Sequence, residues 1–271
     1  EKIKHISERL AEELQVIGPI NFQYAVKDGE VYCIEANPRG SRTLPLLSKA
    51  MDISLPKLAT QAMLGKDIES ADPGKNARGF FVKQSTFPFD RFVQDNIILG
   101  PKMRSTGETM GIDMDKEHAV LKSYQGNYPK ISRVGKIMIS MSDRSKDVLL
   151  PYLKSLHQMG YEFMGTRGTC AYIERQGLPC QKVAKINQTG TSIIEALKDE
   201  QVVMVFNTPM NQGDSKSDGE LIRNSAIQYG IPCFTRTENI KVVVEALIGS
   251  RSHEIMPLSL QDLHHLQKEE A

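Results

Sequence analysis

The chain has 271 residues, of which 40% are hydrophobic and 25% charged, a composition that can build one large or two ordinary globular domains. Its 34 lysines and arginines nearly balance its 33 aspartates and glutamates, which argues against a general binder of nucleic acid or membranes. The chain begins with Glu1, has no signal peptide and has no apolar run near the roughly 20 residues that cross a bilayer. We therefore expect a piece of a longer cytoplasmic protein.

The first half of the chain alternates between helical and strand patterns. Apolar residues at helical spacing predict an amphipathic helix over residues 1–16. Two strands joined at Asp28-Gly29 should follow, and then two short helices over residues 43–64, each with a proline in its first turn. The remaining expectations are a loop over 66–78, a strand over 79–87, and a loop-rich connection with some helix from about 85 to 133.

The pattern becomes regular at Val134, where short apolar strands begin to alternate with amphipathic helices. The expected strands cover residues 135–142, 161–166, 181–186, 201–208 and 231–235. The expected helices cover 145–160, 169–177, 192–199, 218–230 and 239–249. Such alternation predicts an α/β fold, here a doubly wound, five-stranded parallel sheet with helices on both faces. We expect two domains, residues 1–133 and 134–271, the second ending in a polar helix or tail.

The register of the first hairpin decides which polar side chains share one face of its sheet. A two-residue turn would place Gln23 on the face away from Glu35. A three-residue loop over residues 28–30 would instead bring Gln23 opposite Glu35, and Asn21 opposite Asn37. We expect the three-residue loop.

In that register, Gln23, Glu35 and Asn37 would present three hard oxygen ligands on one face. Mg²⁺ favours such sites, where one or two carboxylates are completed by phosphates and water. Arg39 and Arg42 follow the strand and would supply fixed positive charge for a phosphoryl group or a planar acid. The alternative is a polar sheet face closed by an Asn-Pro turn.

Two stretches carry a family resemblance. Residues 21–50, NFQYAVKDGEVYCIEANPRGSRTLPLLSKA, resemble the end of the second ATP-grasp domain in carbamoyl-phosphate synthase large chains, and residues 98–113, ILGPKMRSTGETMGID, resemble the segment after it. The resemblance implies ATP as the substrate and Mg²⁺ or Mn²⁺ as the cofactor. The metal ligands that it implies are Gln23, Glu35 and Asn37. The catalytic residues that it implies are Arg39 and Arg42.

The chain also departs from that family's pattern. An ATP-grasp site needs two further subdomains before this point, with the phosphate-contacting lysine and the adenine pocket, so we expect the 271 residues alone to be catalytically silent. In the bacterial family a glutamate on the next strand helps to bind the activator ornithine. Gln84 occupies that place here, a departure that bears on ornithine activation.

The sequence GTRGT, residues 165–169, lies where a strand should pass into a helix, so backbone N–H groups and the helix dipole can hold an anion. Thr166 and Thr169 add hydroxyl groups, and Lys146 and Lys185 add charge near the carboxyl ends of the strands. The alternative is that Thr166 caps a helix and that both lysines are solvated.

From residue 134 the chain resembles the methylglyoxal-synthase-like regulatory domain that ends the same large chains. The effector implied by the resemblance is a nucleoside monophosphate such as UMP or IMP. The residues that would bind it are Ser140, Lys146, Thr166, Thr169, Lys185 and Asn207. Pro209 replaces a threonine of some relatives, which bears on base recognition. Because His157 lies on a helix and no acid/base constellation is visible, a regulatory domain is favoured over a lyase.

The cysteines, Cys33, Cys170, Cys180 and Cys233, are far apart and lack metal-ligand spacing. We expect free thiols of a reducing compartment. Cys170 follows Thr169, where a thiol at a helix start could be a nucleophile, but a buried helix cysteine is favoured because no partner histidine is placed nearby.

These observations favour part of a glutamine-dependent carbamoyl-phosphate synthase, an ATP-dependent ligase that phosphorylates carbamate. Its expected partners are a glutaminase small subunit or domain and a small-molecule effector, and the intact enzyme is expected to be an oligomer. A non-catalytic nucleotide- or anion-binding module is the rival from another class. Another ATP-grasp carboxylate–amine ligase is a second rival, which the coupled regulatory domain disfavours.

Overall fold

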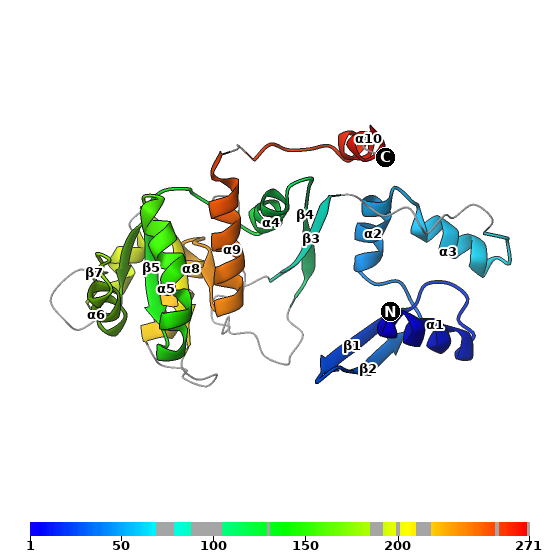
Figure 1. The fold of residues 1–271 in the computed structure, drawn as a ribbon, viewed down its shortest axis with the longest axis horizontal. Helices are drawn as coiled ribbons and strands as arrows, with labels where there is room; N and C mark the ends of the chain where they lie inside the picture. The colour runs from blue at the N-terminus through cyan, green and yellow to red at the C-terminus, as the bar shows by residue number, and fades with distance from the viewer. Residues whose placement is uncertain are drawn as a thin grey trace. The chain divides into compact units, whose positions relative to one another are not determined.

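The computed structural model describes residues 1–68, 79–87, 105–128, 131–184, 192–198, 201–209, 218–252 and 255–269. It has two compact units, Glu1–Phe81 with Leu258–Ala271, and Val82–Pro257 (Figure 1). The predicted α/β class is confirmed. The expected domain boundary after residue 133 stays a prediction. In the part of the chain that the structure describes, no helix has the length and apolarity to cross a membrane.

The first unit contains the helices and the hairpin that the sequence predicts for residues 1–64, together with a C-terminal helix, α10. Its elements are α1 (Lys2–Glu13), β1 (Asn21–Lys27), β2 (Glu30–Asn37), α2 (Thr43–Met51), α3 (Leu55–Met63) and α10 (Leu260–Glu269). Proline is tolerated in the first turns of α2 and α3 because those N–H groups have no partner within the helix. Of its described hydrophobic residues, only Ala50 and Leu263 are fully buried, so this unit has little core of its own.

Strand β3 (Phe80–Thr86) is confirmed, but the sequence did not predict its partner β4 (Gly107–Asp113). Helix α4 (Lys116–Gln125) follows, and Asp115 caps it by accepting the N–H of His118 at 2.9 Å. The strand was missed because its sequence, GETMGID, has two glycines and few apolar residues. Gly111 is required because a side chain there would collide with the backbone of α4.

The second unit is built on five parallel strands, which confirms the predicted sheet. Along the sheet the strands are β7 (Gln181–Lys182), β6 (Glu162–Gly165), β5 (Lys136–Met141), β8 (Val202–Thr208) and β9 (Cys233–Phe234). The chain moves outward in one direction from β5 to β6 and β7, and then in the other direction to β8 and β9. The topological switch point, where open α/β sheets bind ligands, therefore lies between β5 and β8.

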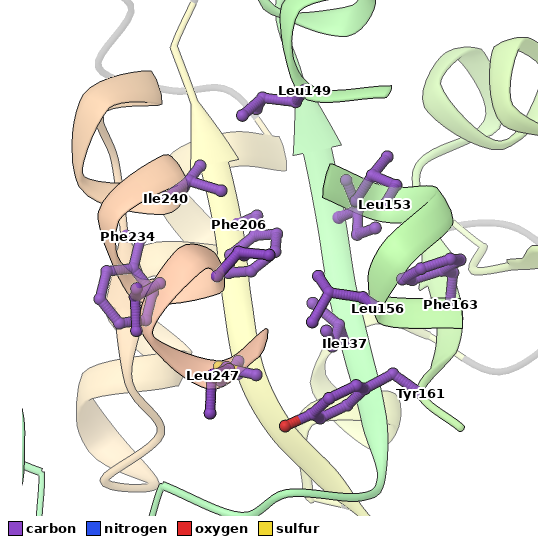
Figure 2. Close-up of a cluster of buried hydrophobic side chains, with 14 of the residues drawn as sticks. Ile137, Leu149, Leu153, Leu156, Tyr161, Phe163, Phe206, Phe234, Ile240 and Leu247 are labelled. Atoms are coloured by element: carbon purple, nitrogen blue, oxygen red, sulfur yellow. The ribbon is translucent and has the colours of Figure 1, made fainter. Parts of the chain in front are cut away.

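Helices cover both faces of this sheet. They are α5 (Asp143–Gln158), α6 (Arg167–Arg175), α7 (Ile193–Lys198), α8 (Asp218–Gln228) and α9 (Thr237–Gly249), followed by the short helix η1 (Ser250–Ser252). One face packs against α5, α6 and α9 through the cluster drawn in Figure 2, which includes Ile137, Leu153, Phe206 and Leu247. The other face packs against α7 and α8. The central strands β5 and β8 are mostly apolar because both faces of the sheet are covered there.

The expectation of four free thiols is wrong for one pair. Cys170 on α6 and Cys180, just before β7, form a disulfide with their Cα atoms 5.3 Å apart. The packing of α6 and β7 on β6 brings the two residues within bonding reach, which their spacing in sequence did not indicate. Cys33 and Cys233 are free thiols, as expected. Burial raises the pKa of the Cys233 thiol to about 12, so this thiol is protonated near neutral pH.

Candidate functional sites

The hairpin has a two-residue turn, so the predicted three-residue loop is wrong. Lys27 pairs with Glu30, and Asp28 and Gly29 between them have φ values of +51° and +78°. Two consecutive residues at positive φ define the hairpin turn that matches the right-handed twist of the strands, and Asp-Gly is among its most favoured sequences. The local chemistry of Asp-Gly therefore set the length of the turn.

A β-bulge nevertheless produces the predicted register. Tyr24 pairs with Cys33, whereas Gln23 pairs with Glu35, so Ile34 is an extra residue in β2. The shift brings Gln23 opposite Glu35 on the same face, and Asn21 opposite Asn37. The predicted register is confirmed, although an inserted residue within the strand produces it and the turn does not.

Gln23, Glu35 and Asn37 form a candidate metal face at one end of this hairpin. The Asn37 amide NH₂ donates a hydrogen bond to the Glu35 carboxylate, which shows that the two side chains lie on the same side. Gln23 and Glu35 are exposed and Asn37 is half-buried. One carboxylate and two amide oxygens are hard donors, so this set fits Mg²⁺ or Mn²⁺.

Arg39 and Arg42 lie in the turn that leads from β2 into α2. The Arg39 N–H donates to the Asn37 carbonyl at 2.8 Å, and its guanidinium donates to the Gly40 carbonyl at 3.2 Å. Arg42 is the N-cap residue of α2. Both side chains are exposed. The structure thus places two guanidinium groups within five residues of the last candidate metal ligand.

The candidate anion site begins at the N-terminus of α6. Thr166 is the N-cap residue of α6, as the alternative interpretation expects, but its side chain makes no capping hydrogen bond. Its hydroxyl instead donates to the Thr169 hydroxyl at 3.2 Å, and that oxygen also accepts the Met141 N–H at 3.0 Å. A side chain added at Gly168 would meet nothing within 4 Å, so the first turn of α6 opens into space. The N–H groups there are suited to an anion.

Lys146 on α5 contacts α6 beyond the first turn of that helix. Its ammonium forms a 2.6 Å ion pair with Asp143 and lies 5.7 Å from the ring centre of Tyr172 on α6. The Lys146 side chain is only 14% exposed, so it is not the solvated lysine of the alternative interpretation. Asp143 is 87% exposed, and hydrogen bonding to Lys146 lowers its pKa. A bound phosphate would compete with Asp143 for the same ammonium group.

The remaining residues predicted for this site lie at the topological switch point or outside the described residues. Ser140 on β5 pairs with Asn207 on β8, at the carboxyl ends of the two strands. Lys185 lies outside the described residues, so its place in the site is a proposal. The structure brings Thr166 and Thr169 together at the end of β5, and it places Lys146 against Tyr172 on α6.

Two features of this region were missed from the sequence. The first is a chain of hydroxyl groups: the oxygen of the buried Ser142 lies 2.9 Å from that of the buried Ser145, which lies 3.2 Å from the oxygen of the half-buried Thr237 on α9. The second is Arg223 on α8, which is 1% exposed and donates to the Asn207 side-chain oxygen at 2.7 Å. No sequence signal distinguished Arg223 from a solvated helix arginine, because its neighbours in α8 include several polar residues.

Comparison with known proteins follows this division of the chain. Residues 1–71 match the family model "Carbamoyl-phosphate synthase L chain, ATP binding domain", and residues 148–235 match the model "MGS-like domain". The chain therefore joins a part that is similar to an ATP-binding domain to a part that is similar to an MGS-like domain.

Relatives match this chain almost from end to end. The "Carbamoyl phosphate synthase large chain, C-terminal section" of Methanocaldococcus jannaschii is 37% identical over 94% of this chain and 43% of its own length. The section of the same name from Methanopyrus kandleri is 33% identical over 97% of this chain and 50% of its own. The large chain of Rubrobacter xylanophilus is 36% identical over 97% of this chain and 25% of its own length. The chain is homologous to the C-terminal section of carbamoyl phosphate synthase large chains, and spans half or less of each of these relatives.

A solved methylglyoxal synthase, from Elizabethkingia anophelis NUHP1, is 15% identical over 42% of this chain and 79% of its own, with a TM-score of 0.33. A score this low carries no argument. The methylglyoxal-synthase-like assignment depends on the family model and on the five-stranded sheet.

Proposed function

We propose that this chain is part of a glutamine-dependent carbamoyl phosphate synthase, in which ATP phosphorylates carbamate and an effector binds the second unit. The observation that carries the catalytic half is the bulged hairpin, in which Gln23 lies opposite Glu35 despite a two-residue turn. A surface hairpin has no need of a bulge, whereas oxygen ligands must share one face to bind one ion. The homology over nearly the whole chain supports the same activity.

Each side chain of the metal face has a role in this proposal. Mg²⁺ or Mn²⁺ would supply neutralisation of the phosphate charge of ATP. Glu35 would hold the ion with its carboxylate, and Gln23 and Asn37 with their amide oxygens. The hydrogen bond from Asn37 holds the Glu35 carboxylate in a fixed orientation. Arg39 and Arg42 would orient carbamate and stabilise the charge of the transferred phosphoryl group.

The wider setting of the enzyme is also proposed. The relatives are named as large chains, which supports a smaller partner, and we expect a glutaminase subunit or domain to supply the nitrogen. The intact enzyme is expected to be an oligomer in the cytoplasm. The 271 residues taken alone should form no carbamoyl phosphate and no ADP above the level of a Glu35→Ala variant, because an ATP-grasp site needs groups on further lobes to position the triphosphate. ADP formation above that control would contradict the proposal.

Paramagnetic Mn²⁺ tests the metal face directly in this chain. In nuclear magnetic resonance spectra, Mn²⁺ should broaden the side-chain NH₂ signals of Gln23 and Asn37. Glu35→Gln should abolish this broadening, since it removes the one carboxylate of the set. Glu30→Gln is the matched control, because Glu30 lies at the other end of β2 and accepts from Lys2 instead. Broadening that survives Glu35→Gln would refute the metal assignment.

The second unit is proposed to bind a nucleoside monophosphate such as UMP or IMP. The open first turn of α6, with the Thr166 and Thr169 hydroxyls, supports a phosphate at this place, and Lys146 on α5, which contacts Tyr172 of α6, is proposed as its first cation. Ser140 and Asn207 would contact the rest of the effector at the switch point. Lys185 is proposed as a second cation for the phosphate. Gln84, where the family has a glutamate for ornithine, makes ornithine a poor candidate for the activator.

Calorimetry of the 271-residue chain with UMP, IMP and inorganic phosphate tests this second half. We expect dissociation constants in the micromolar to millimolar range, about 4–8 kcal/mol, for one charge-assisted phosphate site. Lys146→Ala should weaken binding, whereas Lys154→Ala, at an exposed position on the same helix, should not. Absence of heat with all three ligands would refute the effector site. Effector binding by a chain that shows no Mn²⁺ site would favour the alternative, a non-catalytic regulatory module.

A further inference from the structure

Arg223 is a charged side chain in the interior of the second unit. It lies on α8, is 1% exposed and is among the largest fully buried side chains of the described chain. Its Nη1 donates to the Asn207 Oδ1 at 2.7 Å. Its Nε and Nη2 are also buried, and neither has a hydrogen-bond partner among the residues that the structure describes. A buried guanidinium with one partner is costly, so it calls for a reason other than packing.

The surroundings of Arg223 reduce this cost only slightly. Burial lowers the pKa of the guanidinium, and the negative charge of Glu220 on the same helix opposes that shift from beyond hydrogen-bonding distance. The neighbouring Cys233 thiol has a pKa of about 12 and is neutral near neutral pH. An apolar residue in this place would be expected to give an equal or more stable fold. Stability therefore does not account for a buried arginine here, and the role of Arg223 should be sought in its hydrogen bond to Asn207.

A guanidinium group has only hydrogen-bond donors, so it can face only the oxygen of a neighbouring amide. Arg223 thereby fixes which way the planar Asn207 side chain is turned, with Oδ1 toward α8 and the NH₂ group left for another partner. Asn207 lies at the carboxyl end of β8, paired with Ser140, at the topological switch point of the sheet. The α6 N-terminus follows β6, two strand spacings away, or about 10 Å. A phosphate ion held there is too small to reach Asn207, whereas a nucleoside monophosphate extends further.

We infer that Arg223 is a positioning residue of the effector site: it holds the Asn207 amide so that its NH₂ group donates to an acceptor atom on the nucleoside part of the ligand. This inference rests on the proposed effector function. It predicts that Arg223 matters for nucleotides and not for inorganic phosphate, because only a nucleotide spans the distance from α6 to β8. A purely structural arginine, or a distant positive charge, would affect both ligands alike.

Calorimetry of the whole chain with UMP, IMP and inorganic phosphate separates these roles. Arg223→Met removes the donors and both unpartnered nitrogens while keeping a long side chain. It should weaken binding of the nucleotide that the wild type binds by about tenfold, which corresponds to about one lost hydrogen bond between the Asn207 amide and the ligand. It should change phosphate affinity by less than about twofold. Arg223→Lys keeps the charge but loses the planar guanidinium group, and its nucleotide affinity should lie between those of the wild type and Arg223→Met. Arg175→Met, on the exposed last turn of α6, is the matched control and should bind as the wild type does.

The free protein supplies a second measurement. The side-chain NH₂ resonances of Asn207 should be sharp in the wild type and should shift or broaden in Arg223→Met and Arg223→Lys, because the amide can then turn over. Unchanged nucleotide binding in both variants, or an equal loss of nucleotide and phosphate, would overturn the inference. If the wild type binds none of the three ligands, the effector function itself fails. In that case unchanged Asn207 resonances in the variants would also refute the positioning role.

Discussion

Thr169→Val is the perturbation whose effect follows most directly from the anion site. The Thr169 hydroxyl is buried, accepts the Met141 N–H at 3.0 Å and receives the Thr166 hydroxyl at 3.2 Å. Valine has nearly the same shape but leaves the Met141 N–H without an acceptor at the end of β5. An unsatisfied buried donor costs about 1–3 kcal/mol, so we expect a loss of about 2 kcal/mol in the free energy of unfolding.

Urea unfolding followed by tyrosine fluorescence measures this loss, since the chain has eight tyrosines and no tryptophan. With a urea dependence of about 2 kcal/mol per molar, the midpoint should fall by about 1 M. Thr169→Ser keeps the acceptor and is the matched control, so amide exchange at Met141 should accelerate in the valine variant and not in the serine variant. A midpoint within about 0.3 M of the wild type, with Met141 still protected, would refute the assignment of Thr169 as the acceptor.

Three further predictions address neighbouring groups. Asp143→Asn should tighten phosphate binding by up to about fivefold, the range of an exposed ion pair, because it removes the carboxylate that pairs with Lys146 at 2.6 Å. Asp147→Asn is the control and should leave phosphate affinity unchanged. Equal effects of the two variants in calorimetry would contradict this competition. Asn207→Asp should raise the midpoint of thermal unfolding, because it gives the Arg223 guanidinium a carboxylate partner, and it should weaken nucleotide binding. A lower midpoint would argue against a charged Arg223. A hydrogen bond to Asp147 raises the pKa of Tyr172 to about 12. Asp147→Asn should therefore lower the pKa of Tyr172 toward 10.0 in a spectroscopic titration. An unchanged pKa would exclude that hydrogen bond as the cause.

The sign of the Tyr172 effect on stability follows from the direction of its shift. Its pKa is raised in the folded chain, so the stability contributed by its hydrogen bond is fully present below the unfolded value of 10.0 and is lost as the pH rises through about 12. Stability near neutral pH should therefore not depend on this group. Asp143 has the opposite sign, because its pKa is lowered by the hydrogen bond to Lys146. Its contribution is present above 3.8, the pKa of an ordinary aspartate, and is lost as the pH falls through its lower folded value.

The regular part of the fold was predictable from the sequence because its signals are local and repeated. Strands β5 and β8 are continuous apolar runs, and the helices between strands have one apolar face. Alternation of such elements leaves few topologies, and the parallel sheet is the common one. The weak strand β4 was missed because its pairing with β3 and its packing against α4 stabilise it more than its own residues do.

The candidate sites were predictable only in part, because contacts between distant residues decide their details. The resemblance supplied the residue types, but not the bulge at Ile34, which no sequence pattern marks. The Asp28-Gly29 turn and the register each follow a local rule, and the bulge is the only way for one hairpin to satisfy both. The disulfide between Cys170 and Cys180 likewise depends on packing of elements ten residues apart.

The two units favour opposite physical arrangements for ligands. In the first, the candidate metal face is exposed on a two-stranded sheet, and among the described residues of this unit almost no apolar side chain is buried. In the second, Thr169 at the start of α6 and Asn207 at the end of β8 are both almost fully buried, and each accepts a hydrogen bond from the protein. A preorganised site loses little conformational entropy when its ligand binds. An exposed metal face needs further groups to complete the site around the ion. The second unit should therefore bind its ligand by itself, and the first should not turn over ATP by itself.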